Sequence, residues 1–143
     1  MDIPAIVKGL LVGQNLSGVQ KREYDWVFEF GESTGLIAAC PWRILTSGIA
    51  FTDSDHGQQF GLPAPLDGEQ EALRLLSDKH VQSVSTRSVT GDLAIVFEGD
   101  TTLELLNLSS GYEGWQLVGG TVHIIAQGGG ELVTYSEPDR SGG

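Results

Sequence analysis

The chain has 143 residues, enough for one domain that buries its own core without a metal or a disulfide. Its 8 basic and 19 acidic residues give a formal net charge of −11, which repels phosphate backbones and disfavours nucleic-acid binding. The apolar stretch over residues 3–12 is interrupted by Pro4 and Lys8, so we expect neither a signal peptide nor a membrane span, and a cytoplasmic location.

The beginning of the chain predicts short strands. Residues 6–12 fit a first strand or a short lead-in, and residues 15–30 fit a hairpin. In the second half of that hairpin, Trp26, Phe28 and Phe30 occupy alternate positions. Strand-forming residues at a spacing of two are typical of a half-buried strand.

A turn over residues 31–35 leads to a further strand over 36–40. Pro41 withholds a backbone donor and keeps the preceding residue extended, so a separate short strand is expected over 42–45. Residues 46–66 are weakly patterned and predict a long loop, a kind of segment that often carries function.

One short helix is predicted near residues 68–77. Asp67 is a good N-cap, and Gln70 stands three residues further on in a capping-box relation. The helix has an apolar stripe, which consists of Ala72, Leu73, Leu75 and Leu76.

Strand patterning returns at residue 81 and continues to residue 106. A C-terminal hairpin is expected over 121–135, with the glycines 128–130 as its turn, because a strand and not a helix follows them. Residues 136–143 form a polar tail, which we expect to be disordered. The sequence thus predicts a single globular domain over residues 1–135.

The chain contains a two-copy repeat, with half-repeats at about 12–45 and 77–117. Five positions of the first copy (Asp25, Trp26, Phe28, Phe30, Leu36) match five of the second (Asp92, Leu93, Ile95, Phe97, Leu103). The predicted fold is therefore mainly β (α+β), with antiparallel meanders in two halves around one core. A chance similarity between two amphipathic hairpins is the alternative.

The segment 107–117 combines Tyr112 and Trp115 with several turn-forming residues. It follows the last strand of the second half, as Trp42 and Arg43 follow the last strand of the first. We therefore expect the two segments to lie near each other, with Arg43 close enough to pair with Glu113. These five residues are the candidate binding site, although both tryptophans also fit a core position. For Tyr112 we expect an inward ring whose hydroxyl reaches a polar partner.

The sequence offers no nucleophile and base at a catalytic spacing, so we expect a protein that is not an enzyme and has no cofactor. Asp53, Asp55 and His56 are weak metal-ligand candidates because their spacing does not match a calcium loop, and a polar loop explains them better. The lone Cys40 precedes a proline in an apolar run, which favours a buried structural thiol.

Several short stretches resemble an uncharacterised family of small bacterial proteins. They are Pro-Trp-Arg-Ile at 41–44, His-Gly-Gln-Gln-Phe-Gly-Leu-Pro at 56–63, residues 109–117, and Ala-Gln-Gly-Gly-Gly-Glu-Leu at 126–132. Similar small acidic proteins act as immunity proteins that neutralise toxins, so the resemblance implies a bacterial protein without assigned catalytic residues.

Together these observations predict a non-enzymatic, immunity-like binding module for a basic protein such as a toxin domain. A homodimer is compatible with the sequence, whereas nucleic acid and membranes are not expected partners. The alternative is a small-ligand-binding domain or a cryptic enzyme that uses the region of Trp42, Tyr112 and Trp115.

Overall fold

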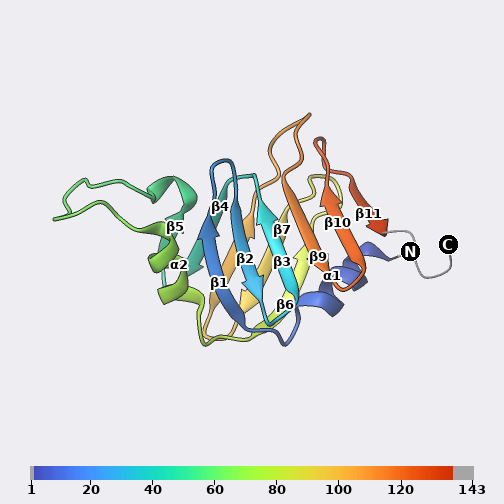
Figure 1. Ribbon diagram of the computed structural model, residues 1–143, viewed down its shortest axis with the longest axis horizontal. Helices are drawn as coiled ribbons and strands as arrows, with labels where there is room; N and C mark the ends of the chain where they lie inside the picture. Colours follow the sequence, from blue (N-terminus) through green and yellow to red (C-terminus); the bar gives the residue numbers. More distant parts are fainter. Residues whose placement is uncertain (1, 137–143) are drawn as a thin grey trace.

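The computed structural model describes residues 2–136 and has a mainly antiparallel β architecture of two sheets, with two short helices (Figure 1). This confirms the predicted fold class. The elements in chain order are α1 (Ile3–Leu11), β1 (Leu16–Lys21), β2 (Trp26–Phe30), β3 (Thr34–Ala38), β4 (Trp42–Thr46), β5 (Ile49–Thr52), the 3-10 turn η1 (Asp53–Asp55), α2 (Gly68–Leu76), β6 (Val81–Thr86), β7 (Leu93–Phe97), β8 (Thr101–Leu105), β9 (Trp115–Gly119), β10 (Val122–Ala126) and β11 (Leu132–Ser136).

Each sheet takes strands from both parts of the chain. One sheet has the order β1-β2-β3-β9-β10-β11, and the other has the order β5-β4-β8-β7-β6. The chain therefore crosses between the sheets twice, over residues 39–41 and over residues 106–114. The two crossovers lie against each other: the Ala39 amide donates to the Gly114 carbonyl and the Leu106 amide donates to the Pro41 carbonyl, each at 2.9 Å.

The order of connection is similar in both parts, since three successive strands enter one sheet and the following strands enter the other, two in the first part and three in the second. The β1–β2 and β6–β7 pairs also share a register shift at corresponding places, after Leu16 and after Val81. The sequence repeat itself stays a prediction.

The core fills the space between the two sheets. Alternate residues of the central strands point inward, so Phe28, Leu36 and Leu103 have no exposed surface. Trp42 lies edge-on to Trp26, with ring centroids 5.0 Å apart. Large aromatic side chains in such a position bring much of the hydrophobic stabilisation of a small domain.

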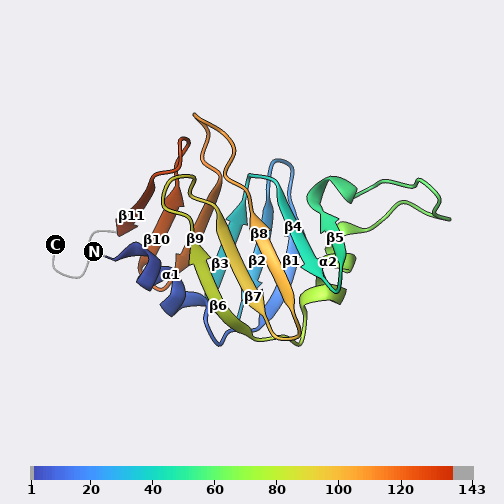
Figure 2. The same ribbon diagram turned by 180° about the vertical axis from the view of Figure 1, so that it is seen from behind.

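The two helices pack at opposite sides of the sandwich (Figures 1 and 2). Helix α1 packs against β6 and β11, and α2 packs against β1 and β4. Edge strands present unpaired backbone groups, and covering them with helices blocks further strand pairing. None of the helices in the described part of the chain is both long and apolar enough to traverse a membrane.

Helix α1 corrects the expectation of a strand or lead-in over residues 6–12. Asp2 caps the helix by accepting from the Ala5 amide, and Pro4 stands in the first turn, where a missing amide costs nothing. Val7 and Leu11, four residues apart, are both fully buried. The predicted helix α2 is confirmed: the Asp67 carboxylate accepts from the amides of Glu69 and Gln70.

The predicted loop over residues 46–66 contains more structure than expected. Strand β5 extends the five-stranded sheet beside β4 before η1 begins. Residues 56–66 then form an arm that projects from the body (Figures 1 and 2). Its base is closed by bonds from the Gly57 amide to the Leu66 carbonyl and from the Leu66 amide to the Gln58 carbonyl. Of the expected tail, Ser136 ends β11, and residues 137–143 lie outside the described residues.

Candidate functional site

Five connecting segments leave the sandwich at the same end, and the arm begins beside them and projects to one side; we call these six segments the loop end (Figures 1 and 2). The antiparallel order places the five strand-to-strand connections together, because every second connection returns to the same edge of a sheet. The loop end consists of residues 22–25, 39–41, 56–66, 87–92, 106–114 and 127–131.

Asn107 holds three of these segments together. Its side-chain amide Nδ2 donates to the Thr90 carbonyl at 3.0 Å and to the Gln127 carbonyl at 3.1 Å, and its backbone amide donates to Asp92 at 2.7 Å. The Trp115 indole adds a bond from Nε1 to the Gly91 carbonyl at 2.8 Å. Buried polar groups with several bonds fix the relative positions of loops that lack regular structure.

Two glycines allow the segments to approach closely. A Cβ at Gly114 would lie 2.1 Å from the Asn107 Oδ1 atom, and one at Gly128 would lie 2.5 Å from the backbone of Gly111. Only a residue without a side chain fits either place. The 107–117 segment is therefore built into the loop end by backbone packing.

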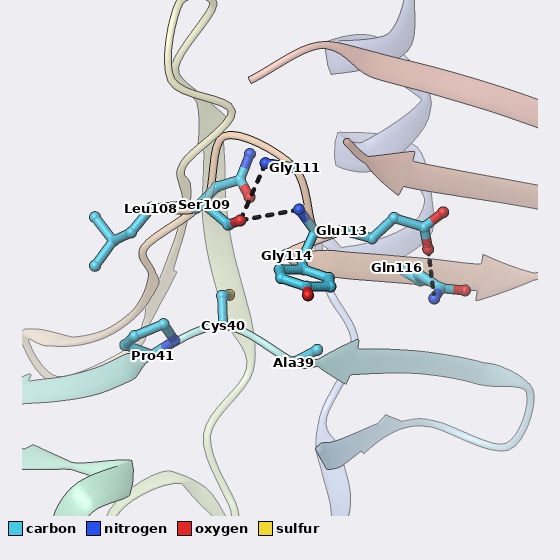
Figure 3. A pocket seen from close by; sticks show the side chains of 11 residues that line it. Ala39, Cys40, Pro41, Leu108, Ser109, Gly111, Glu113, Gly114 and Gln116 are labelled. Atoms are coloured by element: carbon cyan, nitrogen blue, oxygen red, sulfur yellow. Dashed lines mark hydrogen bonds between the residues drawn. The ribbon is translucent and has the colours of Figure 1, made fainter. Parts of the chain in front are cut away.

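An open pocket of about 860 Å³ lies where the two crossovers meet (Figure 3). Ala39, Cys40 and Pro41 line it from the first crossover, and the remaining lining residues come from the second crossover and the start of β9. These are Asn107, Leu108, Ser109, Gly111, Tyr112, Glu113, Gly114 and Gln116.

Cys40 contributes a neutral, apolar surface to this pocket. Burial raises the pKa of its thiol to about 12, so the thiolate is scarce near neutral pH. Only the thiolate is a good nucleophile, which makes Cys40 a poor catalytic group. The expected buried thiol is confirmed.

The structure separates the predicted site residues into two groups. Trp42 and Trp115 have at most 1% exposure. Both therefore occupy core positions, the alternative that the sequence left open beside a binding role. Tyr112 and Glu113 are exposed and line the pocket. A pocket lined by all three rings, as the ligand-binding alternative required, is therefore absent from the described residues.

Tyr112 is 83% exposed, so the expectation of an inward ring with a bonded hydroxyl was wrong. The reason is local. The Ser109 hydroxyl oxygen accepts from the amides of Gly111 at 3.1 Å and Tyr112 at 2.9 Å (Figure 3). This turn satisfies the backbone within the segment, and the tyrosine ring remains at the surface.

Arg43 does not pair with Glu113. It faces outward from the five-stranded sheet, and its Nε atom lies 2.7 Å from Oε1 of Glu104. The register of β4 against β8 places these two residues directly opposite each other, so the cross-strand neighbour is closer than any loop residue.

The weak metal candidates each have a structural partner. Asp53 accepts from the Trp42 amide at 3.3 Å, Asp55 from the Thr52 amide at 3.0 Å, and His56 Nδ1 from the Gly68 amide at 2.9 Å. Within residues 2–136, no group of three metal-ligating side chains is present. Asp55 and His56 cap helix starts, and Asp53 bonds to the start of β4, so each has a structural role.

A chain of hydrogen bonds runs from the pocket across the face of the six-stranded sheet. Gln116 Nε2 donates to Glu113 Oε2 at 3.2 Å (Figure 3), and Gln116 Oε1 lies 2.7 Å from His123 Nε2. Since the glutamine oxygen can only accept, the histidine Nε2 carries a hydrogen.

The sequence did not predict that Gln116 and the crossover residues 39–41 would line the pocket. The position of residues 39–41 just before Trp42 was the available signal.

Comparison with known proteins adds no identity: no protein family, no curated protein and no solved structure matches this chain. The resemblance inferred from the short sequence stretches stays a prediction.

Proposed function

We propose that the protein is a non-enzymatic binding module, immunity-like and bacterial, whose loop end engages a basic protein partner. One observation carries the proposal. The five most exposed large hydrophobic side chains of the described residues all belong to the loop end, and they are Tyr24, Phe60, Val89, Leu108 and Tyr112. Four of them stand on loops at the end of the sandwich, and Phe60 stands on the arm, which projects to one side (Figures 1 and 2). Large hydrophobic side chains left exposed in this way are available for contact with a partner.

The charge supports a basic partner. The net charge of −11 favours encounter with positive surfaces. Of the two basic residues in the loop-end segments, Arg22 is already paired with Asp25, with Nη2 2.7 Å from Oδ2. The pairing holds the pKa of the Asp25 carboxyl below its ordinary value. The arm contributes Phe60 and has no charged residue between 57 and 66.

The test is partner capture with matched variants at the two ends of the sandwich. Phe60→Ser and Tyr112→Ser remove exposed hydrophobic side chains at the loop end, whereas Ile49→Ser removes one in the β4–β5 hairpin. The wild type and Ile49→Ser should retain a basic protein, and raised salt should weaken the complex. The two loop-end variants should each weaken it at least tenfold, as interface hot spots do.

Equal retention by all variants, or a partner that is acidic, would refute the proposal. So would binding that is unaffected by salt, because the charge argument requires screening.

A second function, binding of a small ligand, is favoured by the pocket of about 860 Å³. Ligand pockets commonly measure roughly 300–1,000 Å³. A thermal-shift screen of metabolites, repeated with Tyr112→Ser, tests it. A stabilising compound that loses its effect in the variant would support this function, and a screen without any stabilising compound would count against it.

A further inference from the structure

The pocket at the crossovers has a chemistry that selects one kind of ligand group. We propose that it receives an arginine side chain of the partner, which stacks on Tyr112 and pairs with Glu113. The inference rests on the proposed function, because it names the feature of the basic partner that the loop end recognises.

The lining suits the stem of such a side chain. Ala39, Cys40 and Pro41 form one wall, opposite the segment that contributes Leu108 and the remaining lining residues (Figure 3). Since the pKa of the Cys40 thiol is raised to about 12, this wall carries no charge near neutral pH. The long aliphatic stem of arginine can pack on such a surface while its charged end reaches Glu113.

The charge that the pocket lining carries is negative. Glu113 is the only ionisable carboxylate among the eleven lining residues, and none of them is basic. The carboxylate is positioned in advance, because Gln116 donates to it at 3.2 Å while its own oxygen is held by His123 at 2.7 Å. A carboxylate whose place is fixed before binding loses less entropy when a cation arrives.

Tyr112 supplies a second recognition element beside the carboxylate. Its ring is 83% exposed and lines the pocket, and its backbone is fixed by the Ser109 hydroxyl at 2.9 Å. A planar guanidinium can stack on an aromatic face and also present a fork of donors to a carboxylate. A lysine ammonium offers neither planar stacking nor a two-pronged pair, so arginine is the better match.

The volume indicates that the side chain arrives with part of its own chain. About 860 Å³ exceeds the space of one arginine side chain and leaves room for flanking peptide backbone. We therefore assign the pocket to an arginine within an exposed segment of the partner rather than to free arginine alone.

The experiment uses three blocked peptides that differ at one residue: acetyl-Gly-Arg-Gly-amide, its citrulline analogue and its lysine analogue. Citrulline keeps the shape of arginine but has no charge. NMR titration of the full chain should show shifts at residues 39–41 and 108–116 with the arginine peptide. We expect the citrulline peptide to bind at least about tenfold more weakly, as loss of a charge-assisted bond predicts, and the lysine peptide to fall between them.

Two pairs of variants locate the effect. Glu113→Gln should weaken the arginine peptide about tenfold, whereas Glu131→Gln, which removes the same charge from a neighbouring loop outside the pocket, should not. Tyr112→Leu should weaken it severalfold, and Tyr112→Phe should not, because stacking needs the ring and not the hydroxyl.

Equal affinity for the arginine and citrulline peptides would overturn the inference. An equal loss in Glu113→Gln and Glu131→Gln would also overturn it, because that pattern belongs to overall charge. If Glu113→Gln still captures a basic protein in full, the pocket assignment fails and the proposed function stands. If the arginine peptide binds as expected but no basic protein is captured, the proposed function fails and the pocket assignment stands.

Discussion

Trp115 and Tyr112 are three positions apart, but one ring is buried in the core and the other is exposed. Trp115 begins β9 with its ring in the core and its Nε1 atom bonded to the Gly91 carbonyl, while Tyr112 precedes the strand and remains at the surface. The difference arises from position and not from side-chain chemistry, since Trp115 occupies an inward position of the strand.

Trp115→Ala should destabilise the fold by about 3–5 kcal/mol, because a large buried side chain is replaced by a cavity. Urea unfolding followed by circular dichroism measures the change. Trp115→Phe is the control, since it keeps most of the buried volume and removes mainly the indole bond. A loss smaller than about 1 kcal/mol for the alanine variant would contradict the burial of this residue.

Tyr112→Ala should leave the free energy of unfolding within about 0.5 kcal/mol of the wild type, as substitutions of exposed side chains usually do. The same urea titration checks this. A destabilisation comparable to that of Trp115→Ala would mean that the ring is packed, and would remove Tyr112 from the proposed binding surface.

Cys40 should give the fold an alkaline limit. Burial raises the pKa of its thiol from 9.0 to about 12. The folded state therefore holds the proton more tightly than the unfolded state, and the resulting stability is complete below pH 9 and is lost as the pH rises toward about 12. The difference in unfolding free energy between wild type and Cys40→Ala, measured from pH 7 upward, should shrink over this range. A difference that stays constant would show that the thiol is not protected.

At the scale of elements, the second crossover is held by close backbone packing. Gly114→Ala should cost about 1–3 kcal/mol, because the new methyl group would lie 2.1 Å from the Asn107 Oδ1 atom. Gly111→Ala is the matched control in the same segment, since a Cβ there meets nothing within 4 Å. Thermal unfolding of both variants decides the point, and equal effects would refute the packing argument.

The sequence predicts the strands well where burial alternates. Trp26, Phe28 and Phe30 point inward from β2 as expected, because period-two patterning reflects one buried face. It fails for α1, a nine-residue helix where a strand or a short lead-in was expected, although Asp2 and Pro4 are typical of a helix start. It also fails for β5, whose partner β4 lies across a turn with two positive-φ residues, Ser47 and Gly48.

The candidate site is harder to predict because it depends on contacts between distant segments. The sequence predicted that Trp42 and Arg43 would lie near the 107–117 segment, whereas the residues that bond to the second crossover are those just before Trp42, with the Ala39 amide donating to the Gly114 carbonyl. The pairing of Arg43 was wrong because it depends on the register of β4 against β8. Nothing in the local pattern indicates that Cys40 and Tyr112 line one pocket.

For the whole molecule, the two ends of the sandwich are built differently. The end that carries the β4–β5 and β7–β8 turns has short connections, whereas the loop end has the longer segments and the arm (Figures 1 and 2). Rigid strands that display long loops at one end are a common arrangement in binding proteins. Under the proposed function, the sandwich supplies stability and the loop end supplies recognition.

The net charge of −11 predicts opposite effects of salt on folding and on binding. Repulsion among the 19 acidic residues opposes the compact state. Raising the ionic strength from about 0.01 M to about 0.1 M shortens the screening length from about 30 Å to about 10 Å. The melting temperature should therefore rise with salt, while the affinity for a basic partner should fall.

Sodium chloride and sodium fluoride should act alike if screening is the cause. A melting temperature that falls with salt would mean that attractive pairs such as Arg22–Asp25 and Arg43–Glu104 outweigh the repulsion, and the acidic surface would then have to be explained by the fold rather than by a partner.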